Sequence, residues 1–176
     1  MTFAFIDATE SRVAEIRRIA PGLALEVASL PASSSAASPD PALQARGHVL
    51  AFASAHGIDR ACIAEATDLL TIDGKSLRLE LDSENERRFC RWWRETPARL
   101  HLCVALRRGG DVEMFTATCD GRIADKPAGP DELGWDRLFV PDGHARTLAQ
   151  LVESGVIAGP RPVAYEALAR AVGSAA

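Results

Sequence analysis

The sequence predicts an α/β fold built on a mixed β-sheet, and two observations lead to this prediction. Short apolar runs typical of buried strands and segments with helical periodicity follow one another through the first 70 residues. Further along, two strands of alternating polarity surround the turn-forming residues 107–111, which is the pattern of an antiparallel hairpin. Because strands and helices do not alternate strictly, we expect strands of both directions in one sheet.

Residues that are preferred at the ends of helices mark where the expected helices begin and end. Thr9 or Ser11 is a suitable N-cap for the first helix, and the second helix has Pro41 in its first turn and Gly57 at its end. These signals and the hydrophobic periodicity predict helices at 9–20, 41–57, 83–95, 145–152 and 161–172, and strands at 3–7, 23–30, 60–66 and in the hairpin 98–123.

Chain length and composition are those of an ordinary globular domain. With 176 residues and 47% hydrophobic residues, we expect a single domain over residues 1–176, with two lobes at most. The stretch of small, polar and proline residues at about 31–40 predicts a flexible loop.

The charge and the apolar runs exclude some classes of function. Lys and Arg number 20 against 24 Asp and Glu, so the formal charge of −4 argues against a nucleic-acid partner. No apolar run approaches the ~20 residues that a membrane span needs. The first residues lack the pattern of a signal peptide, so we expect a cytoplasmic protein with no membrane partner.

Residues 134–151 concentrate the residue types that build binding sites. This stretch, GWDRLFVPDGHARTLAQL, combines an aromatic ring, carboxylates, a Pro-Asp-Gly turn, a histidine and an arginine. Loops with such a composition contribute to binding or catalysis more often than they contribute to the hydrophobic core. The sequence therefore points to a ligand site here.

Several motifs in this half of the chain occur in an order that resembles the inosine/xanthosine triphosphate pyrophosphatases. The resemblance covers the strand start Ala98-Arg99-Leu100, the turn Gly121-Arg122-Ile123, the motif Leu133-Gly134-Trp135-Asp136 with Phe139 and Pro141, the helix start Arg146-Thr147, and Arg161 with Ala164. That family hydrolyses non-canonical purine nucleoside triphosphates to the monophosphate and pyrophosphate. The resemblance implies an elongated mixed sheet flanked by helices, two lobes with a central cleft, and a homodimer.

The resemblance also gives roles to residues of the base- and phosphate-binding end. Trp135 would stack on the purine, while Asp136 and Arg161 would contact the edge of the base. Arg12 and Arg146 would reach phosphate, Thr147 would cap the next helix, and Arg78 belongs to a motif at the substrate. From the residues alone, other readings stay open. Trp135 is also compatible with a core anchor, Asp136 with a turn, and Arg146 or Arg161 with a solvated helix surface.

The catalytic end departs from the family pattern. The carboxylate that activates water in the family is replaced by Ala66, which can neither take a proton nor bind metal. The family's metal-binding Glu aligns with Pro39, next to Asp40. By resemblance we expect Mg²⁺ to be held by Glu65 and Asp40, with Glu65 and Asp68 as catalytic residues in a rebuilt site.

Three functions therefore remain open. The first is a nucleotide-binding hydrolase that converts a nucleoside triphosphate to the monophosphate and pyrophosphate. The second is an inactive nucleotide-binding or scaffold homologue, and the third is a family member that acts differently on a nucleotide or a glycosylated metabolite. Glu65 and Asp68 are equally compatible with a structural role at the end of a strand.

Overall fold

The computed structural model describes residues 1–176 with the exception of 31–37, 39, 58–59, 78–82 and 174–176. Most of the expected loop at 31–40, and the expected substrate residue Arg78, therefore lie outside the described residues.

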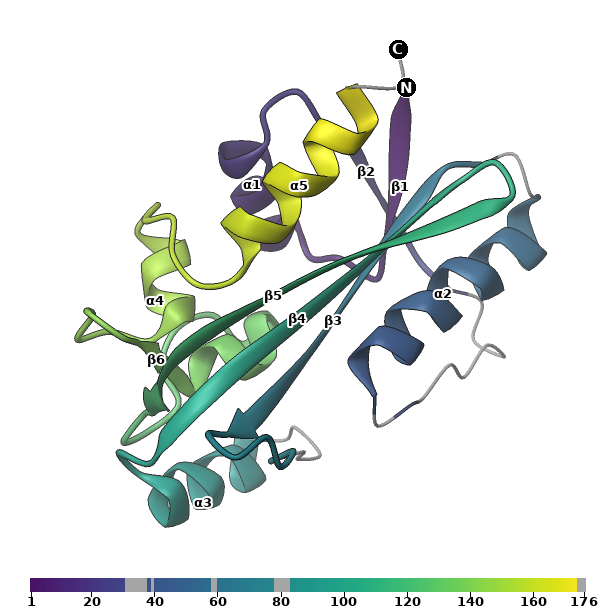
Figure 1. The fold of residues 1–176 in the computed structure, drawn as a ribbon. Coiled ribbons are helices and arrows are strands. Elements are labelled where there is room, and N and C mark those ends of the chain that lie inside the picture. Colours follow the sequence, from purple (N-terminus) through teal and green to yellow (C-terminus); the bar gives the residue numbers. More distant parts are fainter. Residues whose placement is uncertain (31–37, 39, 58–59, 78–82, 174–176) are drawn as a thin grey trace. The chain divides into compact units, whose positions relative to one another are not determined.

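One six-stranded sheet carries the fold, as the sequence predicts (Figure 1). Its strand order is β2-β1-β3-β4-β5-β6. β1 pairs in parallel with β2 and β3, whereas β5 pairs antiparallel with β6, so the sheet is mixed. The strands are β1 (Thr2–Ile6), β2 (Ala24–Ala28), β3 (Cys62–Thr71), β4 (Pro97–Arg108), β5 (Asp111–Ile123) and β6 (Phe139–Pro141).

The helices begin and end close to the expected positions. Thr9, not Ser11, caps the first helix, because its hydroxyl accepts a hydrogen bond from the backbone N–H of Arg12 at 3.1 Å. Gly57 follows the second helix with a φ of 97°, which disfavours other residues. The helices are α1 (Glu10–Ile19), α2 (Pro41–His56), α3 (Ser83–Trp93), α4 (Leu148–Glu153) and α5 (Arg161–Gly173). Among the described residues, no helix has the length and hydropathy to cross a membrane.

The chain divides into two compact units. Unit 1 contains Met1–Ala66, Leu102–Ala117 and Arg161–Ala176, and unit 2 contains Thr67–His101 and Thr118–Pro160. β3, β4 and β5 each contribute residues to both units. The expectation of one domain over the whole chain, with a cleft between lobes, stays a prediction.

Unit 1 is layered because side chains alternate along its strands. Phe3 and Phe5 of β1 join the apolar core formed with α1 and α5, whereas Ala4 and Ile6 join the core formed with α2. Figure 1 shows α1 and α5 on one side of β1 and β2, and α2 on the other. Both faces of β1 are covered, which explains why this strand is a short continuous apolar run.

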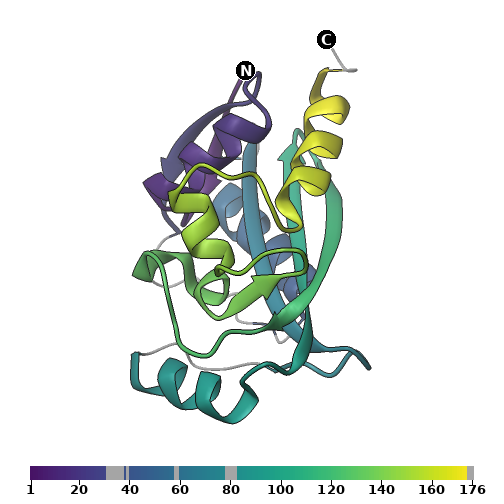
Figure 2. The ribbon, with the colours of Figure 1, turned by 90° about the vertical axis from the view of Figure 1, so that its left-hand side faces the viewer.

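Unit 2 is built around a second apolar core, to which α3, α4 and β6 contribute. A short 3₁₀ segment, η1 (Asp131–Arg137), contacts both α4 and β6 (Figure 2). Gly134, with a φ of 52°, interrupts this segment and turns the chain. The sequence predicted neither η1 nor β6, since β6 has only three residues and η1 lacks regular helical periodicity.

The cysteines form no disulfide. All four are free, and Cys62, Cys90 and Cys103 are buried. Burial raises the pKa of each of these three thiols to about 11, so they stay protonated at neutral pH.

Gly121 is required where β5 meets β6. A Cβ added there would lie 2.3 Å from the carbonyl oxygen of Val140 and 2.6 Å from the ring of Phe139. We expect Gly121→Ala to destabilise the protein by about 1–3 kcal/mol, because backbone and a packed ring must move. Chemical denaturation measures this change. Gly22→Ala is the matched control, since a Cβ at Gly22 meets nothing within 4 Å. Equal stabilities of the two variants would contradict the close approach.

Candidate functional site

Five polar side chains gather in the interior of unit 1. They are contributed by α1, β3 and α5, and we call them the buried charge cluster: Arg12, Glu15, Glu65, Arg161 and Tyr165. Arg161 and Glu15 are each 1% exposed, and Tyr165 is fully buried. Such a concentration of charge in a core requires close pairing.

The spacing of these residues along β3, α1 and α5 explains which face of each element they share. On β3, Glu65 lies two residues after Ile63 and therefore points to the same face, the one covered by α1 and α5. Arg12 and Glu15 are three residues apart on α1, and Arg161 and Tyr165 are four apart on α5, so each pair shares one helix face.

Glu65 is the centre of the cluster. Its Oε1 accepts hydrogen bonds from Nε and Nη2 of Arg161 at 3.0 and 2.7 Å, and its Oε2 accepts one from the hydroxyl of Tyr165 at 3.0 Å. Nε of Arg12 lies 3.6 Å from the same Oε1. Both carboxylate oxygens are therefore engaged by donors from this chain.

Glu15 is the second carboxylate of the cluster. It forms an ion pair with Nη1 of Arg12, and Nε of Arg161 lies 3.8 Å from its Oε2. Two guanidinium groups thus face two carboxylates, which makes the cluster neutral when all four groups are ionised.

Burial and the neighbouring charges in the cluster shift the pKa values of Glu65 and Tyr165. Burial by itself would raise the pKa of Glu65, but the charges of Arg161 and Arg12 and the hydrogen bonds from Arg161 and Tyr165 lower it overall. The pKa of Tyr165 is raised well above its usual value, first by burial and then by the negative charge of Glu65. Glu65 is therefore held ionised and Tyr165 neutral.

The residues expected to hold magnesium are separated by the sheet. Glu65 lies on the face covered by α1 and α5, whereas Asp40 begins α2, whose side chains pack on the opposite face together with Ala66. One oxygen of Asp40 accepts hydrogen bonds from the N–H groups of Ala42 and Leu43 at the start of α2. Within the described ranges, no group of three or more His, Cys, Asp or Glu side chains is arranged to hold a metal ion.

This donor set does not fit a magnesium centre. Mg²⁺ needs oxygen ligands with free lone pairs in octahedral geometry, and the oxygens of Glu65 are surrounded by cationic donors instead. The third expected acidic residue, Asp68, belongs to unit 2 and is buried, and its Oδ1 accepts a hydrogen bond from the N–H of Leu69 at 2.8 Å.

In unit 2 the structure places Trp135 and Asp136 in the interior. Trp135 belongs to the apolar core, is 7% exposed, and meets the ring of Phe89 edge-on with centroids 6.0 Å apart. Asp136 is 1% exposed. The faces of the Trp135 ring are thus largely occupied by protein.

Arg146 and Thr147 precede α4, where Arg146 is exposed and Thr147 is buried. Thr147 caps α4 in a capping box with Gln150, as expected, and its hydroxyl donates a hydrogen bond to the carbonyl of Ala128 at 2.7 Å. Arg146, directly before this cap, is exposed. Its position leaves the guanidinium accessible to an anionic ligand.

Sequence reasoning found Arg12, Glu65 and Arg161 but missed Glu15 and Tyr165, which complete their cluster. The spacing of Arg12 and Glu15, and of Arg161 and Tyr165, was a signal that could have found them. Such spacings are common on solvated helices, so spacing alone does not distinguish a buried pair from a surface pair.

Known proteins resemble this chain in sequence and in fold. Residues 75–155 match the model of the Ham1 family. The dITP/XTP pyrophosphatase of Hyperthermus butylicus is 37% identical over 75 residues, which cover 43% of this chain and 34% of the relative. That of Halalkalibacterium halodurans is 34% identical over 62 residues, which cover 35% of this chain and 32% of the relative. The aligned stretches thus span about a third of these curated relatives.

Solved structures match over the whole chain. The Ham1 protein of Staphylococcus aureus superposes with a TM-score of 0.72 at 17% identity, covering 100% of both chains. A HAM1 protein of Coxiella burnetii gives 0.70 at 16% identity, covering 99% of both. At these identities the likeness establishes the fold.

The first prediction from the cluster concerns its central charge. We expect Glu65→Gln to lower the free energy of unfolding by about 3–5 kcal/mol, because Arg161 and Arg12 then remain buried with one carboxylate for two guanidinium groups. Urea denaturation at neutral pH measures the effect. Glu26→Gln is the matched control, since the Arg60–Glu26 pair is exposed and such pairs contribute about 0–1 kcal/mol. A loss for Glu65→Gln no larger than the control's would refute a structural role of this charge.

A second prediction uses Tyr165, the single tyrosine of the chain. Its folded pKa is raised, so its contribution to stability is complete below about pH 10, the ordinary tyrosine value, and declines as the pH rises beyond it. We expect tyrosinate absorbance in an alkaline titration to appear only when the protein unfolds. In guanidinium chloride the same residue should titrate near pH 10. Ionisation near pH 10 with the fold intact would show that the hydroxyl is accessible.

Proposed function

We propose that this chain, whose residues 75–155 match the Ham1 family model, belongs to that family and that it binds a purine nucleoside triphosphate and hydrolyses it to the monophosphate and pyrophosphate. The named relatives act on dITP and XTP. Both nucleotides carry a keto group at position 6 of the purine and lack the 2-amino group of guanine, so we propose the same class of base for this chain.

One observation carries the proposal. The matched stretch contains Trp135, Asp136, Arg146 and Thr147, the residues that we assign to base and phosphate. Trp135 and Asp136 are held firmly by the core of unit 2, while Arg146 is exposed beside them in the chain. The support for a nucleotide is therefore the matched motif together with an accessible cation that can bind an anionic group.

The reaction is the addition of one water molecule across the α–β phosphoanhydride bond. Water attacks the α-phosphorus, the bond to the bridging oxygen breaks, and pyrophosphate leaves. A carboxylate is needed to orient the water and to receive its proton. We assign this role to Asp68, because Glu65 is already bonded to Arg161 and Tyr165 and Ala66 offers no oxygen.

The same contacts favour a second function for the site. Glu65 is paired with two guanidinium groups and its surroundings do not fit magnesium, which supports a chain that binds a nucleotide without the family's catalysis. The alternative is therefore a homologue that binds the nucleotide and does not hydrolyse it. In either case we propose a second copy of this chain, by resemblance, as its partner.

The test is pyrophosphate release from ITP, XTP and dITP compared with ATP and GTP. We expect turnover of the first three, and we expect Asp68→Asn to reduce kcat by roughly 10²–10⁴-fold because the amide cannot accept the proton. The substituted side chain keeps the Oδ1 that accepts the hydrogen bond from Leu69 N–H, so the melting temperature should change little.

Asp111→Asn is the matched control, because this residue is exposed at the start of β5. A full rate for Asp68→Asn would remove this residue from the reaction. Saturable binding of ITP without pyrophosphate release from the wild type would establish the non-hydrolysing alternative. Absence of both binding and turnover would refute the proposed function.

A further inference from the structure

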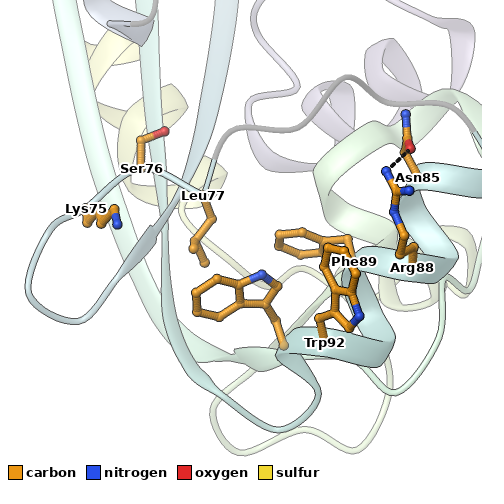
Figure 3. A pocket seen from close by; sticks show the side chains of 8 residues that line it. Lys75, Ser76, Leu77, Asn85, Arg88, Phe89 and Trp92 are labelled. Atoms are coloured by element: carbon orange, nitrogen blue, oxygen red, sulfur yellow. Dashed lines mark hydrogen bonds between the residues drawn. The ribbon is translucent and has the colours of Figure 1, made fainter.

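Unit 2 carries a pocket that none of the roles above uses. Its volume is about 290 Å³, and it lies between α3 and the end of the turn that follows β3 (Figure 3). Its lining combines aromatic, cationic and polar side chains: Lys75, Ser76, Leu77, Asn85, Arg88, Phe89, Trp92 and Trp93.

Aromatic rings form the walls of the pocket. Phe89, Trp92 and Trp93 lie at spacings of three, four and one along α3, which brings Phe89 beside both tryptophans. Figure 3 shows Leu77 pointing towards the aromatic side chains of this helix. Trp92 is 72% exposed and Trp93 is 36% exposed. Large aromatic surfaces left open to water are typical of binding sites.

Two cationic side chains, Arg88 and Lys75, line the pocket. The guanidinium of Arg88 lies over the Trp92 ring at 5.3 Å from its centroid, and its Nη2 donates to Oδ1 of Asn85 at 2.9 Å. This fixes the position of Arg88 while the guanidinium has five N–H donors in total. Lys75 supplies the second charge. Among the described residues that line the pocket, none is acidic, although the chain as a whole has a charge of −4.

The combination of rings and cations defines the class of ligand. A flat heteroaromatic ring gains stacking energy on tryptophan, and an anionic group is attracted by lysine and arginine. The volume is at the lower end of the ~300–1,000 Å³ of small-molecule sites. It therefore suits one base with one phosphate better than a triphosphate.

The accessible tryptophans of α3 also differ from Trp135. Trp135 is 7% exposed and packs against one side of the same Phe89 whose ring lines the pocket. In this unit the ring faces open to a planar ligand are those of α3.

We propose that this pocket binds a nucleoside monophosphate, with the base stacked on Trp92 and Trp93 and the phosphate held by Lys75 and Arg88. The choice of a monophosphate that carries inosine rests on the proposed function, whose reaction would release it. The expectation that the pocket stacks a base and pairs with a phosphate rests on its own side chains and not on that function.

Calorimetric titration of the purified chain with IMP tests this site. We expect saturable binding, and we expect Trp92→Ala to raise Kd roughly tenfold or more through loss of stacking. The double variant Lys75→Ala, Arg88→Ala should also weaken IMP, and salt should weaken binding to the wild type more than to this variant. Inosine, which lacks the phosphate, and ribose 5-phosphate, which lacks the base, should each bind more weakly than IMP.

Arg91→Ala is the matched control, because Arg91 is exposed on α3 and does not line the pocket. Trp92 and the two cations are exposed, so their removal should leave the fold intact, which circular dichroism checks. No saturable binding of IMP, or the same Kd for Trp92→Ala and Arg91→Ala, would overturn the proposal.

Pyrophosphate release by the same variants separates this proposal from the proposed function. Tryptophan-dependent IMP binding in a protein without turnover would support the pocket and refute hydrolysis. Turnover with no effect of Trp92→Ala on IMP binding would support hydrolysis and refute the pocket. An increase in both the Kd for IMP and the KM for ITP in Trp92→Ala would support the pocket and identify it as the place where the substrate's base binds.

Discussion

The ion pair between Arg161 and Glu65 is the constraint on which unit 1 depends. Removing two charges from water costs several kcal/mol for each ion, and close pairing with hydrogen bonds offsets this cost. The two hydrogen bonds from Arg161, the hydroxyl of Tyr165 and the second pair of Arg12 with Glu15 supply such pairing, whereas Oε1 of Glu15 has no hydrogen-bond partner among the described residues. The interior therefore fixes α1, β3 and α5 against one another within unit 1.

The same ion pair bears on the expectation that Glu65 binds a metal ion. A carboxylate that neutralises buried arginines is a poor ligand for a divalent cation, since both positive charges repel the ion. Glu65 is engaged by Arg161 and Arg12 in this structure, and its expected roles as catalytic residue and metal ligand stay predictions. Unit 2 differs from unit 1 in that it leaves two large aromatic side chains exposed. Its core holds Trp135, while Trp92 and Trp93 of α3 stay open to solvent.

Local sequence signals were sufficient for most of the fold and for only part of the candidate site. Apolar periodicity and caps such as Thr9 and Gly57 act within a few residues, so the helices and the hairpin were predictable. The family motifs located Trp135 and Thr147, but burial of Trp135 depends on contacts such as Phe89, from a distant helix. The partners of Glu65 come from two helices far away in sequence, and no local pattern reveals such a meeting.

The distance in sequence between Glu65 and Arg161 has a consequence for how the chain acquires its structure during synthesis. Arg161 lies 96 residues after Glu65, so a nascent chain that has completed β3 must wait for α5 before the carboxylate finds its partners. Until then, the face of the sheet that Ala164, Tyr165 and Leu168 later cover remains without that covering. Unit 1 therefore completes its core only after α5 has been made, and not in the order in which its first three strands are made.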